Sequence, residues 1–282
     1  MTEEIILEYK AIKTKAGIFG LLAGIIIWGF FIWGINYALG PTDVLLRVML
    51  LVPTFIGLGV YCFLLLGAFI LSYSTTDKAL IINWGLTKKK IFWKQVEEIV
   101  HIEGKANLFP IISGSWPGYM VGLYFIGAIG SVRMFATKAE EGFLYIKTNQ
   151  GFYGLTPENA GPLMENISQA SNLPVKTINM NDLPIEVKGV HYSEEPFFNI
   201  LHKLSFGLLI IFGLYLGIMF IRTWVYPFII LLLVLAAALY FFNISNAKRL
   251  YYFSPRGGLV MLFISIAITG LLFIITLNEL TF

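Results

Sequence analysis

The sequence predicts an α+β membrane protein in which five transmembrane helices carry an inserted β-rich domain that ends in a helix. The 282 residues are 57% hydrophobic and only 13% charged, and the mean hydropathy is +0.76. A soluble domain averages about 45–50% apolar and about 25% charged residues. Five apolar runs interrupt the chain, and one long polar stretch separates the second run from the third. These observations together predict the class.

Each apolar run has roughly the 20 residues that a spanning helix needs, and each is nearly free of charge. The runs are 17–39, 44–73, 204–221, 225–242 and 258–277. Residues 40–43 join the first two runs as a tight helical hairpin, and residues 223–224 barely separate the third from the fourth. Because the first run is long enough to span, we expect no cleaved signal peptide.

Loops that are rich in lysine and arginine alternate along the chain with loops that have few or none. Lysines precede the first run and recur in the polar stretch, whereas the first hairpin turn has neither residue type. Lys248, Arg249 and Arg256 occupy the loop before the fifth run. Since loops rich in these residues stay on the cytoplasmic side, we predict a multi-pass protein of the cell membrane. Its N-terminus and central domain would be cytoplasmic, and its C-terminus outside.

The central stretch changes from long apolar runs to short ones that are rich in β-branched and aromatic residues. Glycine and asparagine separate these short runs, a pattern that predicts a meander of antiparallel strands. The expected strands are 79–85, 90–94, 96–102, 131–137, 142–148 and 152–155. We divide the chain into 1–73 (N-terminal segment and first two spans), 74–173 (central domain), 174–203 (proline-containing linker) and 204–282 (last three spans).

A helix is predicted to follow the strands. Residues 156–159 offer a hydroxyl and an amide as caps, and Pro157 is tolerated in a first helical turn. Leu163, Met164 and Ile167 fall at helical spacing and form one apolar face. Strands followed by one helix predict a small β-barrel or bent sandwich that the helix closes.

Several short motifs run through this domain. They include Pro117 and Gly118, then Gly130, Arg133 and Thr137 in one strand, Thr148 at the end of another, and Pro157 before the helix. This pattern resembles the bacterial pleckstrin-homology (PH) like domain family, with Phe135 in place of the usual tyrosine. The resemblance covers about a third of the chain. It implies a membrane-tethered PH-like β-barrel or sandwich in which the motif residues serve the structure, and it implies no enzymatic activity.

Residues 116–129 carry no charge and are too few to span a bilayer. One interpretation is a core strand followed by a glycine-rich turn. The other is a loop that rests in the cytoplasmic leaflet, where aromatic side chains favour the interface. Under that interpretation the candidate membrane-contact residues are Trp116, Tyr119, Tyr124 and Phe125.

Lys88, Lys89 and Lys90 form a basic run that we place in the first β-turn. They are further candidate membrane-contact residues, because a lysine near an anionic leaflet contributes about 1 kcal/mol of attraction. The alternative is a solvated hairpin tip that helps to set the topology.

Patterns typical of catalytic and metal sites are missing from the sequence. Cys62 is the only cysteine, and His101, His191 and His202 are scattered. Glu97 and Glu98 are adjacent, but neighbours on a strand point to opposite faces. We therefore expect no enzyme, no catalytic, cofactor-binding or metal site, and, with a net charge of only +3, no nucleic-acid partner.

The function that these observations favour is that of a non-enzymatic integral membrane protein. Its cytoplasmic PH-like domain would bind membrane lipids of the inner leaflet or a partner protein, in envelope stress or in immunity to membrane-active peptides. The alternatives are a transport or channel subunit and a membrane-embedded enzyme with a lipid-like substrate. Ion-coupled transport usually needs ionisable residues deep in the membrane. The apolar runs offer only Arg47, close to the start of the second run, where it can reach the interface.

Overall fold

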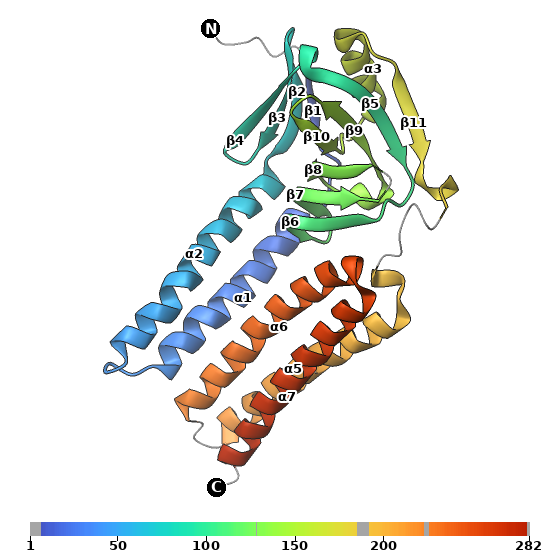
Figure 1. Cartoon of the computed structure of the whole chain (residues 1–282). Helices are drawn as coiled ribbons and strands as arrows, with labels where there is room; N and C mark the ends of the chain where they lie inside the picture. The colour runs from blue at the N-terminus through green and yellow to red at the C-terminus, as the bar shows by residue number, and fades with distance from the viewer. Residues whose placement is uncertain (1–6, 128, 185–191, 223–225, 281–282) are drawn as a thin grey trace. The chain divides into compact units, whose positions relative to one another are not determined.

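A computed structural model describes residues 7–127, 129–184, 192–222 and 226–280 (Figure 1). The chain is an α+β protein, as predicted, and it divides into two compact units. One comprises residues 1–23 and 60–189, and the other comprises residues 24–59 and 190–282. The strands lie in the first unit, and helices α1 and α2 each contribute residues to both.

Five helices of the described chain are long and apolar enough to cross a membrane, which fits the predicted multi-pass protein. They are α1 (Ala16–Ala38), α2 (Val44–Phe69), α5 (Pro196–Arg222), α6 (Pro227–Phe253) and α7 (Pro255–Leu280). The second ends at Phe69, so the last residues of the predicted run 44–73 are not helical. They form a strand instead.

The strands form two open sheets in the described residues. The first has the order β1-β2-β3-β4, from Leu7–Lys10, Leu71–Thr75, Ala79–Trp84 and Thr87–Phe92. The second has the order β11-β5-β9-β10-β8-β7-β6. Its strands in chain order are β5 Val96–Glu103, β6 Leu108–Trp116, β7 Tyr119–Ile126, β8 Gly130–Ala136, β9 Gly142–Thr148, β10 Gly151–Leu155 and β11 Val175–Asn179.

Two strand pairs correct the predicted antiparallel meander. Strand β10 pairs parallel with β8, and β11 pairs parallel with β5. The predicted linker 174–203 is also partly wrong, because it contains strand β11 and the start of α5 at Pro196. The physical reason at α5 is burial, since Phe198 and Leu201 are 0% and 4% exposed and pack in a hydrophobic cluster.

Helix α3 (Ala160–Ser171) confirms the helix predicted after the strands. Its Leu163 and Ile167 are fully buried. They share one hydrophobic core with Leu80 and Ile82 of β3 and with Leu144 and Ile146 of β9. Side chains from both sheets therefore meet at α3. A second core, which includes Tyr124, Val132 and Met134, lies among β5 to β9 and η3 (Met180–Asp182).

The central domain, meaning strands β1 to β11 with α3, begins before the first membrane helix. Strand β1 pairs antiparallel with β2, so that Leu7 lies opposite Thr75 and Lys10 opposite Ser72. At the other side of the helical hairpin, α2 ends at Phe69 and β2 begins at Leu71. A single residue thus separates a membrane helix from a strand of the domain.

Arg47, near the start of α2, contacts the end of α1. Its guanidinium donates hydrogen bonds to the carbonyl oxygens of Leu39 and Gly40 (3.0 Å for Gly40). These carbonyls follow the last turn of α1, where backbone acceptors lack helical partners. Arg47 therefore caps α1 and closes the hairpin between α1 and α2.

Helices α5, α6 and α7 carry polar groups that pair with one another. Ser205 and Ser265 are buried, with their hydroxyl oxygens 3.0 Å apart. The ring of His202 lies 3.2 Å from the Tyr240 hydroxyl. Interhelical hydrogen bonds of this kind stabilise helix packing in lipid.

Candidate functional site

The ends of α1 and α2 are packed against the central domain by aromatic side chains, which we call the aromatic junction. It consists of Phe63 of α2 and of Trp84, Trp116, Tyr119 and Phe135 from the sheets. The Trp84 ring meets Phe63 edge-on at a centroid distance of 5.0 Å and Phe135 at 5.7 Å. Such aromatic pairs contribute about 0.5–1.5 kcal/mol each beyond the area that they bury.

Hydrogen bonds fix the same junction. The Trp84 indole donates to the Tyr119 hydroxyl. The Trp116 indole donates to the Ala16 carbonyl at the start of α1 (2.9 Å). On the facing helix, the Tyr61 hydroxyl donates to the Gly20 carbonyl. Helix α1, helix α2 and the sheets are therefore joined by directional bonds as well as by packing.

One glycine allows the close approach of helix and indole. A Cβ atom at Gly67 of α2 would overlap the ring of Trp84. Glycine at this position thus lets the backbone of α2 lie directly against a side chain of β3.

The segment 10–16, which joins β1 to α1, is held along its length by the domain. Thr137 donates from its hydroxyl to the Ile12 carbonyl (2.7 Å), and the Ile12 amide donates to the Thr156 carbonyl (2.9 Å). The Thr14 hydroxyl donates to the Gly118 carbonyl (3.1 Å). An isolated bridge pairs Ala11 with Pro157. We call these bonds the segment clamp.

Tyr73 of β2 connects the first sheet to the second. Its hydroxyl donates to the Phe135 carbonyl (2.7 Å) and accepts from the Thr156 amide (3.1 Å). The side chain is fully buried, and burial raises the pKa of its hydroxyl. Sequence reasoning missed this residue because it counted Tyr73 within the second apolar run. A tyrosine four residues beyond a helix end gives no separate signal in the sequence.

Most of the predicted motif residues lie at turns or at the segment clamp. Gly118 (φ +81°) is in the β6–β7 turn after the exposed Pro117, and Gly130 (φ +97°) begins β8. Both glycines occupy the left-handed region that other residues adopt at a cost. Thr148 donates to the Gly151 carbonyl (2.7 Å) and fixes the β9–β10 turn. Arg133 is exposed on β8.

Part of this domain matches a known protein family. Residues 71–171 match the bacterial PH domain family. The match runs from the first residue of β2 to the last residue of α3. Strands β1 and β11 lie outside it. Searches of curated proteins and of solved structures each gave no match.

The uncharged stretch 116–129 is mostly strand β7 of the PH domain, as the first interpretation held. Residues on opposite faces of this strand are covered by different partners. Tyr119 and Val121 pack with Ala16, Leu64 and other residues at the helix ends, whereas Tyr124 lies in the second core. Ala128 lies outside the described residues.

Burial corrects two of the candidate membrane-contact residues. Tyr119 is 0% exposed and Tyr124 is 1% exposed, so neither ring is available to a lipid headgroup. Trp116 and Phe125 are partly exposed. Most of the aromatic residues that suggested an interfacial loop instead belong to a strand that has buried residues on both faces.

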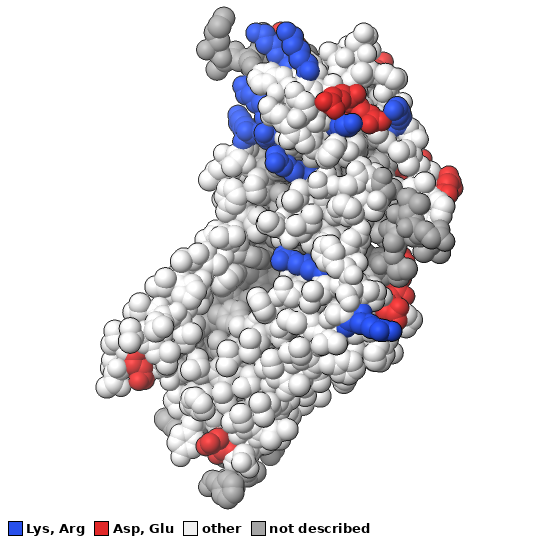
Figure 2. Space-filling model, viewed as in Figure 1, with Lys and Arg blue, Asp and Glu red and all other residues white. Residues whose placement is uncertain are grey.

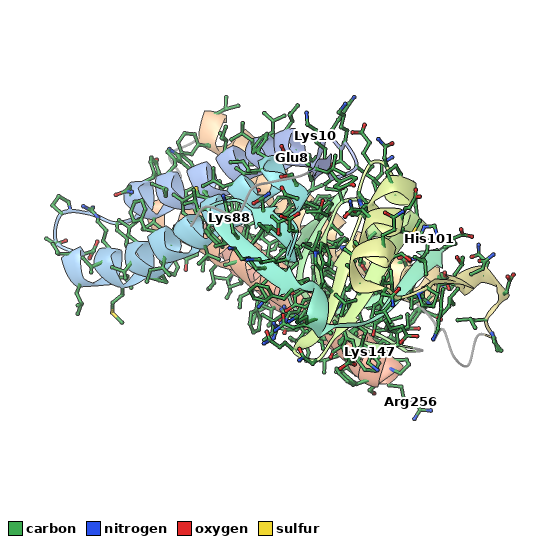
Figure 3. The ribbon with its side chains drawn as sticks, turned by 90° about the horizontal axis from the view of Figure 1, so that it is seen from above. Glu8, Lys10, Lys88, His101, Lys147 and Arg256 are labelled. Carbon is green, nitrogen blue, oxygen red and sulfur yellow. The ribbon has the colours of Figure 1, made fainter. Side chains whose placement is uncertain are left out.

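The sequence placed the basic run in the first β-turn, but the run lies on strand β4. Its side chains therefore alternate. The Lys89 ammonium lies over the Tyr153 ring, 5.9 Å from its centroid, whereas Lys88 and Lys90 are exposed. Lys88 lies on β4 beside α2 (Figure 3). In the view of Figure 2, positive charge gathers over the PH domain, and the surface of α2 is almost uncharged.

The turn before β4 contains a residue that sequence reasoning missed. Leu86 is 78% exposed. The preceding Gly85 donates its amide to the carbonyl of Ile70, directly after α2 (2.9 Å). Leu86 is thus an exposed apolar side chain at the level where a membrane helix ends. Its place within a Gly-Leu-Thr-Lys sequence was the only available signal.

Charged side chains of the central domain form ion pairs at its surface. Lys176 of β11 contacts Glu98 of β5 at 2.7 Å, and this hydrogen bond lowers the pKa of the Glu98 carboxyl. The His101 ring lies 3.3 Å from Glu103 on the same strand. The described residues hold no group of three or more His, Cys, Asp or Glu that could bind a metal. His191 lies outside them.

Proposed function

We propose that this chain is a non-enzymatic membrane protein whose PH domain is held against the inner leaflet in one orientation. The observation that carries the proposal is the direct continuation of helix into strand. Only one residue separates α2 from β2, and the segment clamp holds the chain before α1. Without a flexible linker on either side of the helical hairpin, the PH domain presents a constant face to the bilayer.

That face carries side chains suited to a lipid surface. Leu86 projects beside the end of α2, and Lys88 follows it on β4. An apolar side chain stabilises binding by entering the interface, and a nearby lysine adds attraction to anionic lipid. These residues favour the inner leaflet over a protein partner as the main contact of this face.

The cytoplasmic placement of the PH domain rests on the lysine and arginine pattern of the loops. A phosphatase fused after Thr42 should be active outside the cell, and one fused after Lys90 should be inactive. Activity of the second fusion would reverse the orientation.

The finer features of the proposal follow from the PH family. The two open sheets and α3 would form a PH-like sandwich with α3 covering one opening. Envelope stress or protection against membrane-active peptides is the setting that we propose, by analogy with other small membrane proteins of this fold. The polar pairs of α5, α6 and α7 support a role in helix packing. No feature of the described residues favours a transport path over that role.

A depth measurement tests the contact with the leaflet. In a Cys62→Ser background reconstituted into anionic bilayers, a spin label on Leu86→Cys should be more accessible to oxygen than to a water-soluble nickel chelate. A label on Lys94→Cys, beyond the far end of β4, should show the opposite order. If both labels prefer the nickel chelate, the face is aqueous, and a protein partner becomes the better account.

A further inference from the structure

A shallow surface cavity of about 570 Å³, wide open to its surroundings, lies where the segment 10–16 enters α1. Three lysines from two parts of the chain line it, namely Lys13, Lys15 and Lys138. Phe19, in the first turn of α1, and Pro117, in the β6–β7 turn, supply apolar walls. The cavity therefore combines a cationic part with an apolar part.

The segment clamp sets the positions of these lysines. Lys13 follows Ile12 and Lys138 follows Thr137, and the Thr137 hydroxyl donates to the Ile12 carbonyl (2.7 Å). Lys15 follows Thr14, whose hydroxyl donates to the Gly118 carbonyl. The backbones that carry the three ammonium groups are thus fixed to one another before any ligand binds. Such preorganisation lowers the entropic cost of binding.

Two carboxylates face the lysines, but at long distances. The Lys13 ammonium lies 3.5 Å from Glu158, and that of Lys138 lies 3.8 Å from Glu141. Exposed ion pairs of this kind stabilise little. For Lys15, the described residues include no ion pair. The cavity therefore has an excess of positive charge that an anion would complement.

The position of Phe19 indicates which kind of anion the cavity would bind. Its ring is 51% exposed, and it belongs to a helix that is long and apolar enough to span a membrane. A ligand in this cavity would place its charged group among the lysines and its apolar part along the first turn of α1. That is the arrangement of a phospholipid at the bilayer surface.

We propose that this cavity binds the phosphate headgroup of an anionic membrane lipid, with an acyl chain against Phe19. The inference rests on the proposed function in one respect, since it takes the start of α1 to lie at the inner leaflet. It goes further by assigning a defined lipid site, on residues separate from Leu86 and Lys88.

The test uses the full chain in a mild neutral detergent. Thermal unfolding is followed while phosphatidylglycerol, phosphatidylcholine or glycerol 3-phosphate is added. Phosphatidylglycerol should raise the melting temperature in a saturable manner, and phosphatidylcholine should raise it much less. Glycerol 3-phosphate should have little effect, because it lacks the chain that contacts Phe19. An equal shift with glycerol 3-phosphate would assign the site to free phosphates and overturn the lipid proposal.

Variants locate the site. Lys15→Gln with Lys138→Gln should weaken the apparent affinity for phosphatidylglycerol roughly 10- to 30-fold, and the corresponding arginine variant should restore it. Lys78→Gln with Lys94→Gln removes the same charge at the other end of the first sheet and should bind like the parent. Equal affinity in both glutamine variants would overturn the proposal. Because no bilayer is present, this result is independent of the depth measurement at Leu86.

Discussion

Replacing Trp84 by alanine should destabilise the PH domain by about 2–4 kcal/mol. Truncation of a buried tryptophan typically costs about 3–5 kcal/mol. Because Trp84 is partly exposed, we expect a smaller loss of stability. The substitution removes ring contacts with Phe63 and Phe135 and leaves the Tyr119 hydroxyl without the indole donor. It also opens the space beside Gly67 that the indole fills.

The free energy of unfolding can be followed by a brief protease pulse on the purified chain at increasing urea concentration. Trp33→Ala serves as the matched control, because Trp33 lies on α1 away from the junction and is 48% exposed. In the Trp33→Ala chain, the PH domain should unfold at the same urea concentration as in the parent chain. A Trp84→Ala chain that also unfolds there would show that the aromatic junction does not support the domain.

The second large effect is expected for Tyr73→Phe. The change removes one oxygen atom, but it leaves both the Thr156 amide and the Phe135 carbonyl without their partner in a fully buried place. A buried polar group without a partner costs about 1–3 kcal/mol. We therefore expect a loss of at least about 2 kcal/mol for the two groups together, with little change in shape.

Tyr9→Phe is the control for this substitution. The Tyr9 hydroxyl makes a long, exposed bond to the Pro162 carbonyl (3.5 Å), so its removal should cost well under 1 kcal/mol, as for a weak surface interaction. The same protease pulse compares the two variants. Equal stability of the two would mean that the Tyr73 hydroxyl does not join β2 to the second sheet.

The features that the sequence predicted correctly are those with a strong local signal. Long, nearly uncharged runs identified the five helices of the described residues that are long and apolar enough to cross a membrane. Helical spacing identified α3 through Leu163 and Ile167. The motif around Gly118, Gly130 and Pro157 identified the PH domain. Each of these signals is a pattern along the sequence, so no knowledge of contacts between distant residues was needed.

The features that were missed depend on contacts between distant parts of the chain. Strands β1 and β11 are short, and each is recognised only by its partner, β2 or β5. Strand β7 was ambiguous, because a strand covered on both faces has the composition of a membrane segment. Tyr73 looked like the end of a span, since nothing nearby in the sequence shows that its hydroxyl bonds to Thr156.

The central claim is that the PH domain and the adjoining ends of α1 and α2 move as one body, and a distance measurement tests it most directly. In a Cys62→Ser chain in lipid nanodiscs, pulsed electron spin resonance would compare two label pairs. Val60 of α2 with Glu165 of α3 crosses the aromatic junction, whereas Lys94 with Glu165 lies within the PH domain, and all three positions are exposed. The account predicts distance distributions of similar, narrow width for both pairs. A broad distribution for Val60 with Glu165, beside a narrow one for Lys94 with Glu165, would contradict it.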